Sequence, residues 1–265
     1  MFIIHTPLTK LKCTMFKHKL KASLIHLLLS AVVISVLISL ILIFWFPSPF
    51  LGITNFKDIA IILIAIDLVL GPLLTFVVFN PKKKSLKKDL ATIVFVQLFA
   101  LTYGLYTLFL THPVYITYFD NGFNIITAKQ ATPEKARYKQ LKISKFSSPV
   151  IAYMDVNEKT RNSLFAEAMN GGNDIEARAE HYEPYEDNID KILEKSLNPN
   201  IIFKGESEKE KLALFIKKYG KTKLDYAYLP LIGPAKDVVW VLDKNTAKPI
   251  DTISVNPWAI ISKKD

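Results

Sequence analysis

Apolar, uncharged residues dominate the first 112 positions of the chain and become scattered after them. Three runs stand out, at residues 22–46, 59–79 and 90–110, with lengths of about 25, 21 and 21 residues. Each run is long enough to cross a hydrocarbon core of about 30 Å as a helix. The pattern predicts a membrane protein with a three-helix transmembrane region at 22–112, followed by a separate domain at 113–265.

The positions of the lysines predict the orientation of these helices. Lysines cluster before the first run and between the second and third, whereas Lys57 stands alone between the first and second. By the positive-inside rule, residues 1–21 and the loop at 80–89 face the cytoplasm, and residues 113–265 lie outside. The first run is too long for a cleaved signal peptide, so we expect a retained anchor. The clustered lysines are Lys10, Lys12, Lys17, Lys19, Lys21, Lys82, Lys83, Lys84, Lys87 and Lys88.

The net charge of +10 is largely a consequence of this topology. The first 112 residues hold 11 Lys and Arg against 3 Asp and Glu, and the remainder holds 23 against 21. Because the excess lies beside the apolar runs and not on a folded domain, we expect no nucleic acid partner. The single cysteine, Cys13, falls on the cytoplasmic side, so the external domain has to fold without disulfides.

The chain after the third run mixes strand and helix patterns. Alternating β-branched and aromatic residues on both sides of Asp120-Asn121-Gly122 predict a β-hairpin. The stretch ESEKEKLALFIKKYG predicts a helix with a capping box at Ser207 and Glu210. Other expected elements are a strand at 149–156, a helix from the cap Asn157 to Asn170, a helix begun by Asp187 or Asn188, and a hairpin at 237–255. These patterns predict a mixed α+β periplasmic domain after the three helices.

Few residues point to catalysis. The sequence contains no phosphate-binding glycine loop, no GxSxG, no HExxH and no CxxC. The segment EHYEPYED, residues 180–187, has two interpretations: a divalent cation site, or an acidic loop that leads into a helix. Its single histidine argues against the usual hydrolytic zinc sites. We expect no catalytic residue, no cofactor and no metal. The residues of the alternative cation site are Glu180, His181, Glu183, Glu186 and Asp187.

Asp67 is the one charged residue in the second apolar run. An aspartate at the centre of a membrane helix costs about 2.5 to 3.5 kcal/mol, whereas each Leu, Ile, Phe or Val contributes about 0.3 to 0.6 kcal/mol in favour of insertion. The apolar residues of the run outweigh this cost, so the helix inserts with Asp67 inside it. Gly71 and Pro72 lie one turn further on, where we expect a bend and close packing on a neighbouring helix.

A carboxyl group at this depth requires a polar partner. With a rise of about 1.5 Å per residue, Asp67 lies about 18 Å from the cytoplasmic edge, at the height of Thr102 and Tyr103 and near that of Ser35. Gln97 lies about one turn nearer the cytoplasm. Two hypotheses follow for Asp67: an internal hydrogen bond that holds the three helices together, or a polar group presented to the membrane helix of another protein.

Several stretches of the sequence resemble one known family. They are MFKHKLKAS, DLVLGPLLT, KKDLATIVFVQLFALTYGLY, HPVYITYFDNGF, YLPLIGPAKDVVWVLD and VNPW. Together they resemble the TfpX/TfpZ family of type IV pilin accessory proteins, over nearly the whole chain. DLVLGPLLT and YLPLIGPAKD are the most specific of these stretches.

The resemblance implies a multi-pass protein of the inner membrane of pilus-bearing Gram-negative bacteria. It implies that this protein supports the display of a major pilin as pili, and that residues 1–14 are an extension. We therefore expect a non-catalytic, chaperone-like accessory protein that binds the membrane helix and head of the type IV major pilin, or the pilus assembly machinery. The candidate partner-binding residues are Asp67, Gly71, Pro72, Gln97 and Tyr103. Two alternatives stay open: an envelope enzyme that modifies pilin, and a regulatory membrane subunit.

Overall fold

A computed structural model of the chain describes the backbone of residues 7–258 and the side chains from residue 14. The side chains of nearly all of the expected extension, residues 1–14, lie outside this description. The chain divides into two compact units. The helical unit comprises residues 1–41 and 57–109, and the sheet unit comprises 42–56 and 110–265.

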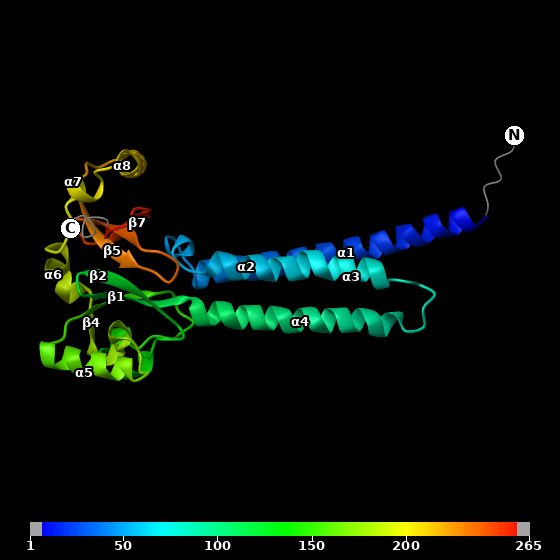
Figure 1. Ribbon diagram of the computed structural model, residues 1–265, viewed down its shortest axis with the longest axis horizontal. Helices are drawn as coiled ribbons and strands as arrows, with labels where there is room; N and C mark the ends of the chain where they lie inside the picture. Colours follow the sequence, from blue (N-terminus) through cyan, green and yellow to red (C-terminus); the bar gives the residue numbers. More distant parts are fainter. Residues whose placement is uncertain (1–6, 259–265) are drawn as a thin grey trace. The chain divides into compact units, whose positions relative to one another are not determined.

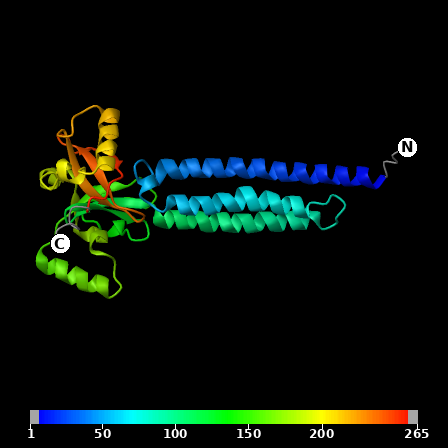
Figure 2. The ribbon, with the colours of Figure 1, turned by 45° about the horizontal axis from the view of Figure 1, so that its top comes forward.

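Three long helical segments form the helical unit and lie alongside one another (Figures 1 and 2). Thr14–Phe44, Phe56–Val78 and Leu86–Thr111 have 31, 23 and 26 residues and are apolar enough to cross a membrane. The second segment is interrupted in its middle by a π-helical turn. Its elements are α2 (Phe56–Ala65), η2 (Ile66–Leu70) and α3 (Gly71–Val78), and the flanking helices are α1 (Pro7–Phe44) and α4 (Leu86–Thr111).

One seven-stranded mixed sheet organises the sheet unit, with strand order β4-β3-β1-β2-β5-β6-β7. The pairs β1·β3 and β2·β5 are parallel, and the other neighbouring pairs are antiparallel. The strands are β1 (Pro113–Phe119), β2 (Gly122–Thr127), β3 (Val150–Met154), β4 (Tyr182–Pro184), β5 (Tyr226–Ile232), β6 (Val238–Asp243) and β7 (Pro249–Ile253). The α-helices are α5 (Glu158–Met169), α6 (Ile189–Leu193), α7 (Pro199–Ile202) and α8 (Glu206–Tyr219).

Short 3-10 turns complete the sheet unit. They are η1 (Phe50–Gly52), η3 (Pro133–Lys135), η4 (Lys139–Leu141), η5 (Ile175–Ala177), η6 (Ala179–His181) and η7 (Glu186–Asn188).

Both faces of the sheet are buried, and successive residues of a strand belong to different clusters. In β6, Trp240 packs into the cluster on one face, whereas Val239 and Val241 pack into a cluster on the other. The first face is covered by residues of α6, among them Ile192, and the second by residues of α7 and α8 over β5 to β7 and of α5 over β1 and β3. This alternation follows from the two-residue period of a strand. It explains why β5 and β6 are apolar at almost every position.

The connection between α1 and α2 is part of the core of the sheet unit. Phe50 and Ile53 are buried in the cluster that contains Trp240, and the carbonyl oxygen of Ile53 accepts a hydrogen bond from the backbone N–H of Ala235 at 3.0 Å. A Cβ atom on Gly233 would lie 2.1 Å from Cγ2 of Ile53 and 2.8 Å from its carbonyl oxygen. Only glycine therefore leaves room for Ile53 at this position.

The hairpin predicted around Asp120-Asn121-Gly122 is confirmed as β1 and β2. The cap at Asn157 is also confirmed, because its side chain accepts a hydrogen bond from the backbone N–H of Thr160 at 2.9 Å. The hairpin at 237–255 is confirmed as β6 and β7, and the strand at 149–156 as β3. These elements depend on local patterns, which the sequence displays directly.

The prediction of a capping box at Ser207 and Glu210 is wrong. The N-cap of α8 is Gly205, and no side chain caps it. The acidic stretch at 180–187 also differs from expectation, because Tyr182–Pro184 forms β4 at the edge of the sheet with Tyr182 and Tyr185 buried. Tyr185 and Tyr182 anchor that stretch in the two clusters on either side of the sheet.

β5 was not predicted as a strand, although it lies inside the sheet. Pro230 stands in its middle, and a proline there normally argues against a central strand. The pairing with β2 begins at Leu231, one residue later, so Pro230 lies beyond the paired part of that edge. Gly122 lies close to this point, and a Cβ atom on it would be 3.3 Å from Cβ of Pro230.

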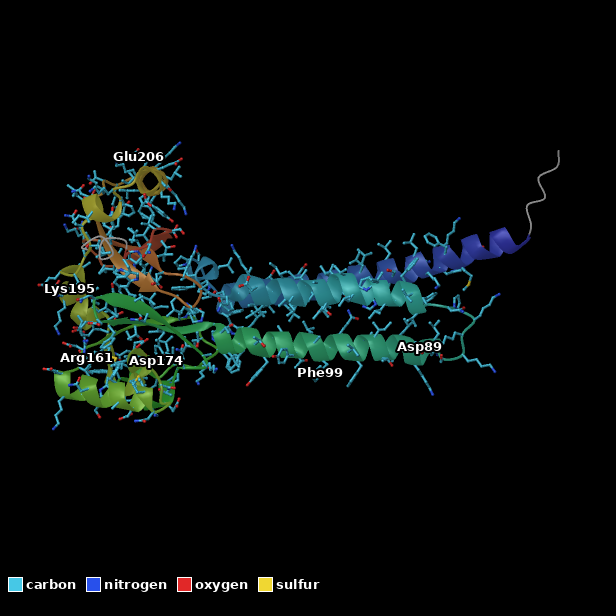
Figure 3. All side chains as sticks on the ribbon, viewed as in Figure 1. Asp89, Phe99, Arg161, Asp174, Lys195 and Glu206 are labelled. Atoms are coloured by element: carbon cyan, nitrogen blue, oxygen red, sulfur yellow. The ribbon has the colours of Figure 1, made fainter. Side chains whose placement is uncertain are left out.

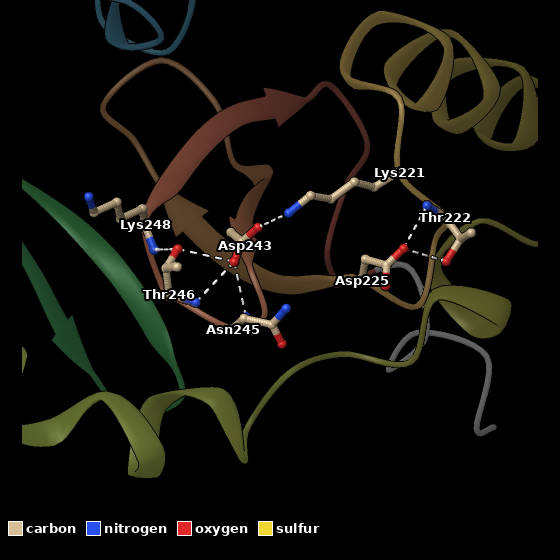
Figure 4. Close-up of polar contacts among 7 residues, drawn as sticks. All are labelled: Lys221, Thr222, Asp225, Asp243, Asn245, Thr246 and Lys248. Carbon is tan, nitrogen blue, oxygen red and sulfur yellow. Dashed lines mark hydrogen bonds and ion pairs between the residues drawn. The ribbon is translucent and has the colours of Figure 1, made fainter.

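Asp243 holds the turn between β6 and β7 (Figure 4). Its Oδ1 atom accepts hydrogen bonds from the backbone N–H groups of Asn245 at 3.0 Å and Thr246 at 2.9 Å, and Oδ2 pairs with the ammonium of Lys221. The bond from Lys221, together with those from Thr246 and Asn245, holds the pKa of Asp243 at about 2. The carboxylate therefore fixes the KNTA turn in its charged form.

We expect Asp243→Ala to lower the free energy of unfolding by about 1 to 3 kcal/mol, because charged hydrogen bonds to a turn are lost. The folded-state pKa lies below the ordinary Asp value of 3.8, so this stabilisation is complete above that value and is lost as the pH falls through about 2. Denaturation of the full chain in detergent, followed by tryptophan fluorescence from pH 2 to 7, tests this. A difference between variant and wild type that is independent of pH would contradict it.

Gly233→Ala is expected to destabilise the sheet unit by about 1 to 3 kcal/mol, because the new methyl group overlaps Ile53. Gly52→Ala is the matched control, since a Cβ atom at Gly52 meets nothing within 4 Å. The measurement is the same fluorescence-detected unfolding of the full chain. Equal stabilities of the two variants would show that Ile53 is not held against Gly233.

Candidate polar site in the helical unit

A cavity of about 560 Å³ opens among the helices of the helical unit. Most of its wall is apolar, but polar side chains from all three segments reach it. Since polar groups in an apolar helical bundle are rare and have to be paired, their position identifies the candidate site. The polar lining residues are His18, Lys21, His26, Ser30, Asp67, Thr75 and Gln97.

Asp67 lies in the π-helical turn and is 4% exposed. The backbone N–H of Gly71 bonds to the carbonyl of Ile66. In an α-helix it would bond to the carbonyl of Asp67. The next residue, Pro72, has no N–H to give. The carbonyl of Asp67 therefore has no donor within its own helix, and the side chain of the same residue adds a carboxyl group.

Gln97 of α4 supplies this missing donor. Its Nε2 atom lies 3.3 Å from Oδ1 of Asp67 and 3.5 Å from the backbone oxygen of Asp67. A Cβ atom on Gly71 would lie 2.1 Å from the same Nε2 atom. The glycine makes room for the amide, and Pro72 prevents a backbone donor from taking its place. The hydrogen bond between the two helices thus depends on four residues together: Asp67, Gly71, Pro72 and Gln97.

A second set of polar contacts joins α1 to α3. The hydroxyl of Ser23 donates to the carbonyl of Pro72 at 2.8 Å, and Nδ1 of His26 lies 2.6 Å from Oγ1 of Thr75. The ammonium of Lys19 donates to the carbonyl of Val77 at 3.0 Å. Residues 19, 23 and 26 have the i, i+4, i+7 spacing of one helix face. α1 therefore carries a polar stripe that faces the Gly71-Pro72 segment.

Tyr103 is placed away from this site. It is 68% exposed, and Thr102 bonds to the carbonyl of Leu98 in its own helix. The rise per residue placed Tyr103 level with Asp67 and Gln97 about one turn nearer the cytoplasm, but the side chain that reaches Asp67 is that of Gln97. A rise per residue gives no direction, and the six residues from Gln97 to Tyr103 rotate the helix by about 240°. Gln97 therefore points towards Asp67, whereas Tyr103 points elsewhere. Ser35, at a similar predicted height, is also exposed.

Sequence reasoning missed His26 and Thr75. His26 stands within the first apolar run and was not among the candidate residues. A lone histidine in such a run was the available signal, because an imidazole there needs a polar partner. The segment at 180–187 forms no comparable site: among the described residues, no group of three or more His, Cys, Asp or Glu is placed to hold a metal ion.

Comparison with known proteins places this chain among pilus proteins. The model of the family described as fimbrial assembly protein FimB matches residues 14–54, which cover α1 from Thr14 onwards and the connection that follows it up to Thr54. A "Fimbrial assembly protein, serogroups C1 and C2" of Dichelobacter nodosus is 39% identical over 110 residues, or 40% of this chain and 83% of that protein. The chain belongs to the fimbrial assembly protein family.

Two further members of the fimbrial assembly protein family match over most of their length. The fimbrial assembly proteins of serogroups I and E1 of D. nodosus are 27% and 28% identical, each over 254 residues, and each match covers 89% of this chain and 96% of the relative. No solved structure matches the chain. The family identity therefore agrees with the resemblance to type IV pilin accessory proteins, over nearly the whole sequence.

We expect energetic coupling between Asp67 and Gln97. Gln97→Leu leaves a carboxyl and a carbonyl group without their donor, and Gly71→Ala displaces the amide with the same result. In a double-mutant cycle of Gln97→Leu and Asp67→Leu, the coupling should reach about 0.5 to 1.5 kcal/mol, measured by unfolding in mixed micelles. Phe99→Leu is the control, since Phe99 is 72% exposed and lies on the outer side of α4 (Figure 3). Additive effects of the two Leu variants would exclude the contact.

Proposed function

We propose that this protein is a non-catalytic, chaperone-like accessory protein of the bacterial inner membrane that holds a type IV pilin before its assembly into pili. The family relationship supports a general role in pilus assembly, because the relatives are named as fimbrial assembly proteins. The polar site beside an apolar cavity in the helical unit supports the more specific role, binding of the membrane helix of a pilin. Neither of the two alternatives, a pilin-modifying enzyme and a regulatory subunit, gains a supporting observation.

The proposed topology has three transmembrane helices with the N-terminus in the cytoplasm and the sheet unit in the periplasm. The length and apolar character of the three helical segments support insertion. The lysines of residues 15–21 and 82–88 support the orientation, because both clusters would face the cytoplasm. In this arrangement the chain offers a membrane partner both an intramembrane surface and a folded domain.

Asp67 is the proposed contact with the membrane helix of the pilin. Its carboxyl group has one described side-chain donor, the amide of Gln97, and a carboxyl can accept further hydrogen bonds. The cavity beside it is lined mainly by apolar side chains, which suit an apolar helix with one polar group. A hydrogen bond from that group to Asp67 would fix the depth of the partner helix, because such bonds are formed out of reach of water.

The decisive experiment compares surface pili and total pilin in a strain without this gene. Strains that carry wild type, Asp67→Leu, Gln97→Leu or Phe99→Leu are compared in parallel, and immunoblots give the level of each variant. We expect deletion and Asp67→Leu to reduce pili several-fold, whereas Phe99→Leu restores them. Loss of pilin itself in the deletion strain would indicate stabilisation, and persistence of pilin in the membrane would indicate a role at assembly.

Unchanged pilus number and pilin level in the deletion strain would exclude the proposed function. Full activity of Asp67→Leu, at a normal protein level, would exclude Asp67 as the contact and leave it an internal structural residue. These two results are distinct, because the first concerns the whole chain and the second one side chain.

A further inference from the structure

A second surface, in the sheet unit, has the properties of a peptide-binding cleft. A cavity of about 500 Å³ lies between α7 and α8 and reaches the segment after α8. Its volume is within the range of about 300 to 1,000 Å³ that is typical of ligand pockets. The lining residues are Pro199, Asn200, Phe203, Lys204, Lys209, Leu212, Ala213, Ile216 and Lys223.

The floor of this cleft is apolar and its residues come from one face of a helix. Leu212, Ala213 and Ile216 of the floor, together with Lys209 on the rim, follow the i, i+3, i+4, i+7 spacing of α8. Leu212 is buried, and Ala213 is exposed and leaves space above it. Phe203, after α7, is buried beside the floor. The amphipathic pattern that directs Leu212 into the core thus also leaves a small residue facing outwards.

The rim of the cleft is positively charged. Three of the nine lining residues are lysines and none is acidic. Lys209 forms an ion pair with Glu206 at 2.6 Å. Lys223 donates to the side-chain oxygen of Asn200 at 2.7 Å, which carries no charge. Lys204 makes no ion pair with a described residue. Two exposed ammonium groups therefore remain without a counter-charge. An apolar floor with uncompensated cations on the rim is complementary to apolar side chains flanked by carboxylates.

Two exposed apolar side chains stand next to lining residues of the cleft in the sequence. Ile201, next to Asn200, is 47% exposed, and Leu224, next to Lys223, is 65% exposed. Exposed apolar residues beside a charged rim are typical of protein interaction sites. We infer that the cleft between α7 and α8 binds a segment of a partner protein in which large apolar side chains are flanked by Asp or Glu. This inference goes beyond the proposed function and does not assume that the partner is a pilin.

The test measures binding of a defined peptide to the full chain in nanodiscs of uncharged phosphatidylcholine. The probe is a fluorescein-labelled hexapeptide with Phe-Leu between two pairs of Glu, and the comparison peptide has Gln in place of each Glu. Anisotropy should show tighter binding of the Glu peptide, and its Kd should rise with salt. Lys204→Glu combined with Lys223→Glu should raise the Kd for the Glu peptide by about tenfold or more.

Two variants make the result specific. Lys159→Glu combined with Lys195→Glu reverses two exposed charges outside the cleft and should leave the Kd unchanged (Lys195 is labelled in Figure 3). Ala213→Phe fills the cleft without a change of charge and should also raise the Kd for the Glu peptide. Equal binding of the Glu and Gln peptides, or an unchanged Kd in the Lys204→Glu and Lys223→Glu variant, overturns the inference. A third result also overturns the inference: wild type binds vesicles of phosphatidylglycerol but neither peptide, and the Lys204→Glu and Lys223→Glu variant no longer binds the vesicles. The cleft would then recognise a lipid surface and not a protein segment.

Discussion

A backbone carbonyl without a donor in its own helix is the constraint that organises the helical unit. The π-helical turn moves the N–H of Gly71 to Ile66, and Pro72 has no hydrogen to replace it. In apolar surroundings an unpaired carbonyl is costly, so a neighbouring helix has to supply the donor. Gln97 does so from α4. The polar contact between these two helices at Asp67 is therefore made by one amide group, and a sequence change at any of these residues affects the others.

The space left by a glycine is a second constraint, and it acts in both units. Both family-specific stretches contain a Gly-Pro pair, and in both the glycine admits a side chain from a distant part of the chain. Gly71 admits the amide of Gln97, and Gly233 admits Ile53. The structure thus gives a steric reason for the glycine in each stretch. It also links the α1–α2 connection to the sheet, since Ile53 and Phe50 belong to the core of the sheet unit.

Much of the fold was predictable from local patterns, and the failures involve contacts between distant residues. Long apolar runs indicated the three helices, and alternation with turn residues indicated both hairpins. The partner of Asp67 was not determined, because a rise per residue gives height along a helix but not the direction of a side chain. β5 was missed because Pro230 argues against a central strand, and only the short pairing with β2 shows how the proline is accommodated. The position of Ile53 had no local signal, since it depends on Gly233.

The two edges of the sheet have a consequence for a protein that belongs to an assembly family. β4 has three residues and ends at Pro184, and β7 has five residues and begins at Pro249. Short edge strands with a proline present few free backbone groups to which another strand could be added. The sheet is therefore a poor template for self-association or for capture of a partner by strand addition.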